Sequence, residues 1–138
     1  MSKDFSEVDT LAVLTSGGDS PGMNAAVRAV VRTSIKNNIK VYGVYRGYQG
    51  LIEDDFFEMS KSSVSNIIQR GGTILKSARS QDFRTEEGRA KANENLRKRN
   101  IDSLVVIGGD GTFTGASILS KEHGFNVVGI PATIDNDI

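Results

Sequence analysis

The chain has 138 residues, of which 38% are hydrophobic and 25% are charged, a composition typical of one folded domain and not of a disordered segment. Its 17 Lys and Arg residues balance 17 Asp and Glu residues, which argues against binding nucleic acid or anionic membranes through bulk charge. The absence of cysteine excludes disulfides and thiolate metal sites and fits a reducing cytoplasm. The polar N-terminal residues do not form a secretory signal, and no apolar run approaches the roughly 18 residues of a membrane span.

The first half of the chain predicts two strands and two helices around a glycine-rich loop. Short apolar runs predict the strands, and apolar residues at three- and four-residue steps predict one face of the first helix. Ser63 could cap the second, shorter helix, which a glycine pair would end. The strand, loop, helix, second strand and short helix cover residues 11–14, 15–19, 23–35, 39–45 and 63–68.

The second half continues the alternation of helices and strands. Thr85 is predicted to cap a helix, because it precedes two acidic residues that suit the positive end of a helix dipole. This helix is expected to reach about Asn100, with the basic run 97–99 as a solvated end. A third strand, a glycine motif, a helix, a fourth strand and an acidic segment follow at residues 104–107, 108–112, 113–119, 127–130 and 133–137.

Strands that alternate with helices and lack hairpin turns indicate parallel pairing. The expected fold is therefore α/β, a doubly wound, Rossmann-like sandwich with a mainly parallel sheet and right-handed crossovers. Ligands in such sheets bind at the carboxyl ends of the strands. Three polar motifs follow strand ends here, namely residues 15–24, 108–112 and 133–137.

The motif Gly108–Thr112 lies between a predicted strand and a predicted helix. Its glycines allow the backbone to approach a phosphate, and a helix N-terminus supplies free N–H donors. Asp110 would be repelled by phosphate unless a cation lay between them, so its position implies Mg²⁺. The alternative is an ordinary strand-to-helix turn in which Asp110 caps the helix.

Asp135 and Asp137 are separated by one residue after a strand. In an extended segment they would point to opposite sides, so that one faces substrate and the other a metal. A carboxylate beside a substrate hydroxyl can accept its proton during phosphoryl transfer. The alternative is a turn that caps the next helix. The first motif, residues 15–24, is not a P-loop, because no Lys-Ser or Lys-Thr pair follows its glycines.

Together and in this order, the three motifs, with Arg70-Gly-Gly72 and Ser77-Ala-Arg79 between them, resemble the ATP-dependent 6-phosphofructokinase family along residues 10–138. The resemblance implies magnesium-assisted transfer of the γ-phosphoryl group of ATP to fructose 6-phosphate, a step of glycolysis. It also implies a cytoplasmic homotetramer that responds to ADP or phosphoenolpyruvate.

The resemblance assigns roles to individual residues. Asp135 would be the general base, and Arg79 would stabilise the charge that is transferred. Thr133 and Asp135 would contact the sugar phosphate, while Asp110 and Asp137 would serve Mg²⁺. The nucleotide would be bound by Gly18, Tyr48, Arg79, Ser80, Gly109, Asp110, Gly111 and Thr112, and the allosteric effector by Arg28, Arg32 and Lys61.

Three positions depart from the family pattern. Ser80 stands where bacterial relatives often have an aromatic residue, so stacking on adenine from this position is lost. Ala132 replaces the usual glycine before Thr133 and crowds the phosphate approach slightly. Lys61 replaces a common arginine, which keeps the charge but loses bidentate phosphate geometry.

The chain is expected to be the N-terminal, nucleotide-binding part of such an enzyme, without the C-terminal part that binds the sugar phosphate. By itself it is expected to be inactive, marginally stable and prone to self-association through an exposed apolar patch. Two alternatives remain at this point. One is a nucleotide-binding module without catalysis, and the other is a different kinase with a GGDGT motif, such as an NAD kinase.

Overall fold

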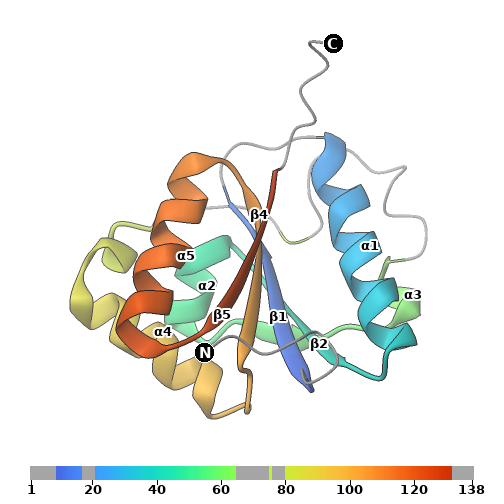
Figure 1. Cartoon of the computed structure of the whole chain (residues 1–138), viewed down its shortest axis with the longest axis horizontal. Helices are drawn as coiled ribbons and strands as arrows, with labels where there is room; N and C mark the ends of the chain where they lie inside the picture. Colours follow the sequence, from blue (N-terminus) through green and yellow to red (C-terminus); the bar gives the residue numbers. More distant parts are fainter. Residues whose placement is uncertain (1–8, 17–20, 65–74, 76–79, 132–138) are drawn as a thin grey trace.

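The computed structural model describes residues 9–16, 21–64, 75 and 80–131. A five-stranded sheet in the order β3-β2-β1-β4-β5 carries helices on both faces (Figure 1). The strands are β1 (Thr10–Thr15), β2 (Lys40–Val44), β3 (Phe56–Glu58), β4 (Ser103–Gly108) and β5 (Asn126–Pro131). The helices are α1 (Pro21–Lys36), α2 (Gly47–Glu53), α3 (Lys61–Val64), α4 (Glu86–Arg97) and α5 (Asp110–His123), with a 3₁₀ turn η3 at Asp82–Arg84. Within the described part of the chain, no helix is both long and apolar enough to cross a membrane.

The predicted α/β class and the mainly parallel sheet are confirmed. Strand β1 pairs in parallel with β2 and β4, and β4 pairs in parallel with β5. Strands β1 and β4 lie in the middle and are buried over nearly their whole length, as the continuous apolar runs at residues 11–14 and 104–107 predict. The edge strand β3 runs antiparallel to β2, because the short helix α2 between them returns the chain to the same edge of the sheet. This strand was not predicted from the sequence.

The period-two alternation of the central strands divides the core into two clusters. In β1, Leu11 and Val13 face α1, and Ala12 and Leu14 face α2, α4 and α5. Figure 1 shows α1 and α3 on one side of the sheet and the other three helices on the opposite side. The first cluster also contains Val27, Val31 and Ile107, and the second also contains Leu51, Leu96, Val106 and Leu119.

Several predicted boundaries hold and others change. The cap at Thr85 is confirmed, since its Oγ1 accepts a hydrogen bond of 2.9 Å from the backbone N–H of Gly88. Helix α4 ends at Arg97, however, and residues 98–100 form a turn. The prediction that Ser63 caps a helix is wrong, because α3 already begins at Lys61; the rest of that predicted helix lies outside the described residues.

The basic run 97–99 lies at the end of α4, with Arg97 and Lys98 exposed as predicted and Arg99 half-buried, but its side chains also make specific contacts. Arg97 donates to the carbonyl of His123 at 2.7 Å and stacks on Phe125. Lys98 and Arg99 both bind the carboxylate of Asp54 at the end of α2. These contacts connect α4 to its neighbours α2 and α5, which sequence periodicity alone does not specify.

Candidate functional site

Parallel pairing brings the described parts of the first two predicted motifs to one edge of the sheet; the third, residues 133–137, lies outside the described residues. Thr15 at the end of β1 is in register with Ile107 near the end of β4, and the N–H of Ser16 donates to the Ile107 carbonyl at 2.9 Å. In Figure 1, α1 and α5 both begin at the upper edge of the sheet, where β5 ends. This is the edge at which ligands bind in open parallel sheets.

Packing against the described residues requires glycine at position 108 but not at positions 109 and 111. A Cβ on Gly108 would lie 2.5 Å from Thr112 Oγ1 and 2.6 Å from the Ser16 carbonyl oxygen, so the packing requires glycine here. A Cβ on Gly109 or Gly111 would meet no atom of the described residues within 4 Å. Their backbone conformations do not require glycine either, since neither has a positive φ. The described part of the fold therefore leaves open space above the first turn of α5.

Gly111 lies inside the first turn of α5 and is exposed. A glycine within a helix costs about 0.5–1 kcal/mol relative to alanine. Because neither packing nor a positive φ accounts for it, the space itself is the feature that glycine preserves. A ligand that approaches the backbone closely needs such a space, and the unpaired N–H groups of a helix N-terminus favour an anionic ligand.

Asp110 is the first residue of α5, whereas Gly109 is the N-cap and provides no side-chain cap. The alternative in which Asp110 caps the helix is therefore wrong. Its exposed carboxylate forms no hydrogen bond or ion pair with any residue that the structure describes. Mg²⁺ in phosphoryl-transfer sites is held by one or two carboxylates together with phosphate oxygens and water, and a free carboxylate beside an anion-binding turn fits that chemistry. Over the described ranges, no cluster of three potential metal ligands occurs.

Thr112 has a side chain only 6% exposed, turned toward Gly108. Its carbonyl accepts a hydrogen bond from the hydroxyl of Tyr48. Thr112 thus contributes its backbone to the described site, while its hydroxyl faces the protein.

Tyr48 lies beneath the first turn of α5 and is 8% exposed. Its ring stacks on Phe83, with the ring centroids 4.0 Å apart and the planes 8° apart. Burial raises the pKa of the Tyr48 hydroxyl, and the backbone N–H of Ala116 partly opposes that effect. The sequence did not reveal that Phe83 stacks on Tyr48. The one signal of close packing that the sequence offered was Gly115, an isolated glycine inside a predicted helix.

Ser80 is half-buried and connects two elements next to this stack. Its hydroxyl donates to Gln49 Oε1 at 2.7 Å and accepts from the backbone N–H of Phe83 at 3.3 Å. In the described structure Ser80 therefore holds the turn η3 against α2.

The three residues predicted to bind an effector lie on α1 and α3, two helices in contact on the face of the sheet opposite α5. Arg28 and Arg32 are one turn apart on α1, and Lys61 begins the neighbouring helix α3. Arg32 and Lys61 are exposed and Arg28 is half-buried. None of the three forms an ion pair with another residue of the described part. Five other predicted site residues lie outside the described residues, and their roles stay predictions: Gly18, Arg79, Thr133, Asp135 and Asp137.

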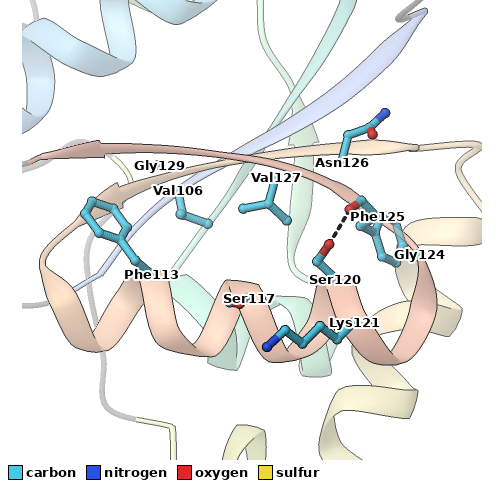
Figure 2. Close-up of a pocket in the computed structure, with 10 residues that line it drawn as sticks. All are labelled: Val106, Phe113, Ser117, Ser120, Lys121, Gly124, Phe125, Asn126, Val127 and Gly129. Atoms are coloured by element: carbon cyan, nitrogen blue, oxygen red, sulfur yellow. Dashed lines mark hydrogen bonds between the residues drawn. The ribbon is translucent and has the colours of Figure 1, made fainter. Parts of the chain in front are cut away.

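A pocket of about 510 Å³ lies between the second half of α5 and strand β5 (Figure 2). Phe113 stands at one end, and Lys121 and Asn126 bring polar groups to its rim. None of the predicted site residues lines it. The pocket is thus a separate feature that runs along α5 from Phe113 to Lys121, on the side that faces β5.

Residues 10–138 match the family model described as Phosphofructokinase. The chain is 64% identical over 129 residues to a protein named ATP-dependent 6-phosphofructokinase of Clostridium botulinum, covering 94% of this chain and 40% of that protein. A protein of the same name from Clostridioides difficile is 63% identical over the same length and share. The chain thus spans about 40% of the length of these curated relatives.

Solved structures agree with this result. Phosphofructokinase from Saccharomyces cerevisiae matches with a TM-score of 0.88 at 42% identity, covering 94% of this chain and 20% of that chain. A pyrophosphate-dependent phosphofructokinase from Marinobacter aquaeolei matches with a TM-score of 0.71 at 22% identity, covering 90% of this chain and 33% of its own, and shares the fold.

Proposed function

The chain belongs to the phosphofructokinase family, and from this premise we propose that it provides the nucleotide-binding part of an ATP- and magnesium-dependent 6-phosphofructokinase. The reaction converts ATP and fructose 6-phosphate to ADP and fructose 1,6-bisphosphate in glycolysis. The open first turn of α5 carries the proposal, because a Cβ at Gly109 or Gly111 would meet no atom of the described residues, which leaves room for a ligand against the backbone. Because residues 10–138 match the phosphofructokinase family, the alternative that the chain is an NAD kinase is no longer supported.

Catalysis in this proposal rests on positioning and on neutralising charge. The N–H groups of α5, with Gly18 and Ser80, hold the phosphates and nucleotide, and Asp110 and Asp137 hold Mg²⁺. When bound, Mg²⁺ neutralises the charge that develops on the phosphate oxygens. Thr133 and Asp135 orient the sugar phosphate.

Two side chains act on the reacting groups. Asp135 accepts the proton of the sugar hydroxyl as that oxygen attacks the γ-phosphorus. Arg79 shares the negative charge of the transferred group. The bond from the γ-phosphorus to the leaving oxygen breaks as the new bond forms, and ADP leaves with that oxygen.

The donor is ATP in this proposal, and not pyrophosphate. Pyrophosphate-dependent members typically have Asp after the metal aspartate and Lys before the Thr-Ile-Asp motif, whereas Gly111 and Ala132 stand there in this chain. A side chain at Gly111 would occupy the open space beside the helix terminus. Turnover with pyrophosphate at a rate comparable to ATP would contradict this assignment.

Arg28, Arg32 and Lys61 form the proposed effector site for ADP or phosphoenolpyruvate, in a cytoplasmic homotetramer. Their position on α1 and α3, on the face opposite α5, supports a site separate from the catalytic edge. Changing Arg28 and Arg32 together to Ala in a full-length tetramer should abolish the response to ADP or phosphoenolpyruvate and leave basal turnover near normal. An unmodified enzyme with no effector response would contradict this role.

A second candidate is a nucleotide-binding module without catalysis. It is favoured by the coverage of about 40% of the curated relatives, because residues that bind the sugar phosphate can lie in the remaining part. A substrate pocket that is only half present loses most of the ~7–11 kcal/mol by which positioning lowers the activation barrier. The chain by itself is therefore expected to bind MgATP without turning it over.

A coupled assay for fructose 1,6-bisphosphate separates the two functions. It compares this chain with an extended chimera, in which residues 10–138 are joined to the part of the Clostridium botulinum relative that follows the matched segment. We expect turnover by the chimera and none by the chain alone. A folded chimera that binds MgATP without turnover would favour the non-catalytic module. Turnover by the chain within a hundredfold of the chimera would show that it is self-sufficient.

A further inference from the structure

The hydroxyl of Tyr48 lies between two backbone groups of helix α5. It donates to the carbonyl of Thr112, and the backbone N–H of Ala116 faces the same oxygen. Residues 112 and 116 are four apart, so their carbonyl and N–H groups are the pair that an ordinary helix joins directly. The side chain of a residue 64 positions away in the sequence thus enters the hydrogen bonding of the first turns of α5.

The ring of Tyr48 is held in this place by two contacts. Phe83 stacks on one face, and α5 approaches the edges of both stacked rings at Gly115, where a Cβ would lie 3.2 Å from Tyr48 and 3.4 Å from Phe83. Such a contact is tight enough that a larger residue at position 115 would displace the stacked rings. The glycine therefore sets how deeply the hydroxyl reaches into the helix.

The stack is itself anchored. Arg89 donates to the carbonyl of Phe83 at 3.0 Å and binds Glu122 with two hydrogen bonds of 2.6 and 3.0 Å. Arg89 is 8% exposed, and paired, buried arginines hold a defined geometry. Helix α5 is thus fixed by Glu122 near its end and by Tyr48 at its beginning.

The first turn of α5 needs such support, because its N-cap Gly109 and its second residue Gly111 are glycines at which even a Cβ would contact no described residue. Glycine gives the backbone more conformational freedom than any other residue, and the open space at Gly109 and Gly111 leaves that freedom unrestricted from above. A turn that presents N–H groups to a phosphate binds well only if their direction is set beforehand.

We propose that Tyr48 is a positioning residue, whose hydroxyl holds the carbonyl of Thr112 and thereby sets the direction of the N–H groups and of Asp110 at the start of α5. This inference rests on the proposed function, in which that turn binds the phosphates of ATP. In this role the Tyr48 hydroxyl acts on the backbone of the turn that binds the phosphates.

The test is Tyr48→Phe in the 138-residue chain, which keeps the stack on Phe83 and removes only the hydroxyl. The matched control is Tyr45→Phe, since Tyr45 also stacks on a phenylalanine, Phe57, at 4.5 Å and its hydroxyl makes no hydrogen bond to another residue in the described ranges. We expect Tyr48→Phe to raise amide hydrogen exchange locally at the first two turns of α5 and to weaken MgATP binding by roughly 2- to 10-fold, the equivalent of one hydrogen bond. The control should match the unmodified chain in both measurements.

Gly115→Ala is a second variant, because its Cβ should displace the stack and reproduce both effects with the Tyr48 hydroxyl still present. Unchanged exchange and unchanged MgATP affinity in Tyr48→Phe would overturn the inference. A general rise in exchange across the sheet would also overturn it, because that result indicates lost stability and not lost positioning. If the unmodified chain binds no MgATP, the proposed function fails for this chain, and the local exchange of α5 still decides the role of Tyr48.

Discussion

The two ends of helix α5 differ in what lies beside them. At its first turn, Tyr48 supports the backbone from below and Gly109 and Gly111 leave free space above. From Phe113 to Lys121, a pocket of about 510 Å³ lies between the helix and strand β5, and Val128, on the other face of that strand, is 56% exposed. Both ends of α5 are held by side chains from other elements, Tyr48 at the first turn and Arg89 at Glu122, but the open surface beside each end is of a different kind.

This difference separates two causes of an open surface. The first turn of α5 is open because Gly109 and Gly111 have no side chains. Such a gap in a backbone that is otherwise supported is the arrangement expected of a ligand site. The space at β5 exists because the strand ends the described sheet and exposes apolar residues, which is typical of a surface that another chain segment can cover. The predictions below test this comparison, beginning with the largest expected effect.

The largest effect is expected at the catalytic edge, from Asp135→Asn in the extended chimera. Asparagine has nearly the same shape but cannot accept the proton, so kcat should fall by roughly 10²–10⁴-fold with MgATP binding largely retained. Asp110→Asn should instead change the dependence of the rate on Mg²⁺ concentration. Steady-state kinetics at varied Mg²⁺ measures both. Near-native turnover by Asp135→Asn would return this residue to the role of a turn cap.

The second prediction compares two glycines of one motif, Gly108 and Gly111. Gly108→Ala should lower the free energy of unfolding by roughly 1–3 kcal/mol, since its Cβ would overlap Thr112 and the Ser16 carbonyl. Gly111→Ala should raise it by about 0.5–1 kcal/mol, because alanine suits a helix better and meets no atom of the described residues. Urea denaturation measures both changes.

The same two variants distinguish packing from ligand binding. Gly111→Ala should weaken MgATP binding by roughly tenfold despite its greater stability, because its methyl group enters the proposed phosphate space. Calorimetric titration measures the affinity. A stabilised Gly111→Ala chain with unchanged affinity would remove the ligand explanation for the open turn.

The third prediction concerns self-association through β5. The N–H of Asn126 donates to Asp102 on the side of β4, so by alternation the N–H groups of Val127 and Gly129 point to the outer edge, and Pro131 has none. Two copies of the chain paired antiparallel about Val128 would use both N–H groups of each copy, four donors in all. Sedimentation at micromolar concentration should therefore show dimers, and Val128→Lys should weaken association by roughly tenfold. Ile118→Lys is the control, since Ile118 is also exposed but lies on α5. A monomer that unfolds cooperatively would contradict this prediction and the expectation of marginal stability.

The smallest effect is expected from the ion pairs of Asp54. Partial burial acts to raise the pKa of this carboxyl, but hydrogen bonds from Arg99 and Lys98 outweigh it, and the pKa is lowered from 3.8. Its contribution to stability is therefore present above pH 3.8 and is lost as the pH falls below that value. Asp54→Asn should reduce the free energy of unfolding at pH 7 by less than about 1 kcal/mol and should flatten its pH dependence below about pH 5. Urea midpoints at pH 7 and pH 3.5 measure this, and an equal pH dependence in both chains would contradict it.

Much of the fold could be predicted from the sequence because its signals are local. Apolar runs in the central strands, three- and four-residue apolar steps in α1 and the cap at Thr85 all act over a few residues. Parallel pairing followed from the alternation of these elements, and with it the position of the glycine motif at a strand end. These inferences needed no knowledge of which distant residues meet.

The tertiary structure decided what depends on contacts between distant residues. Glycine at positions 108 and 111 looks alike in the sequence, and only the packing against Ser16 and Thr112 separates them. The basic run 97–99 suggested a solvated helix end, yet Asp54 and Phe125 lie beside it. Tyr48 reaches Thr112 across 64 positions, a contact that no local pattern encodes, because it forms only when α2 and α5 pack on the same face of the sheet.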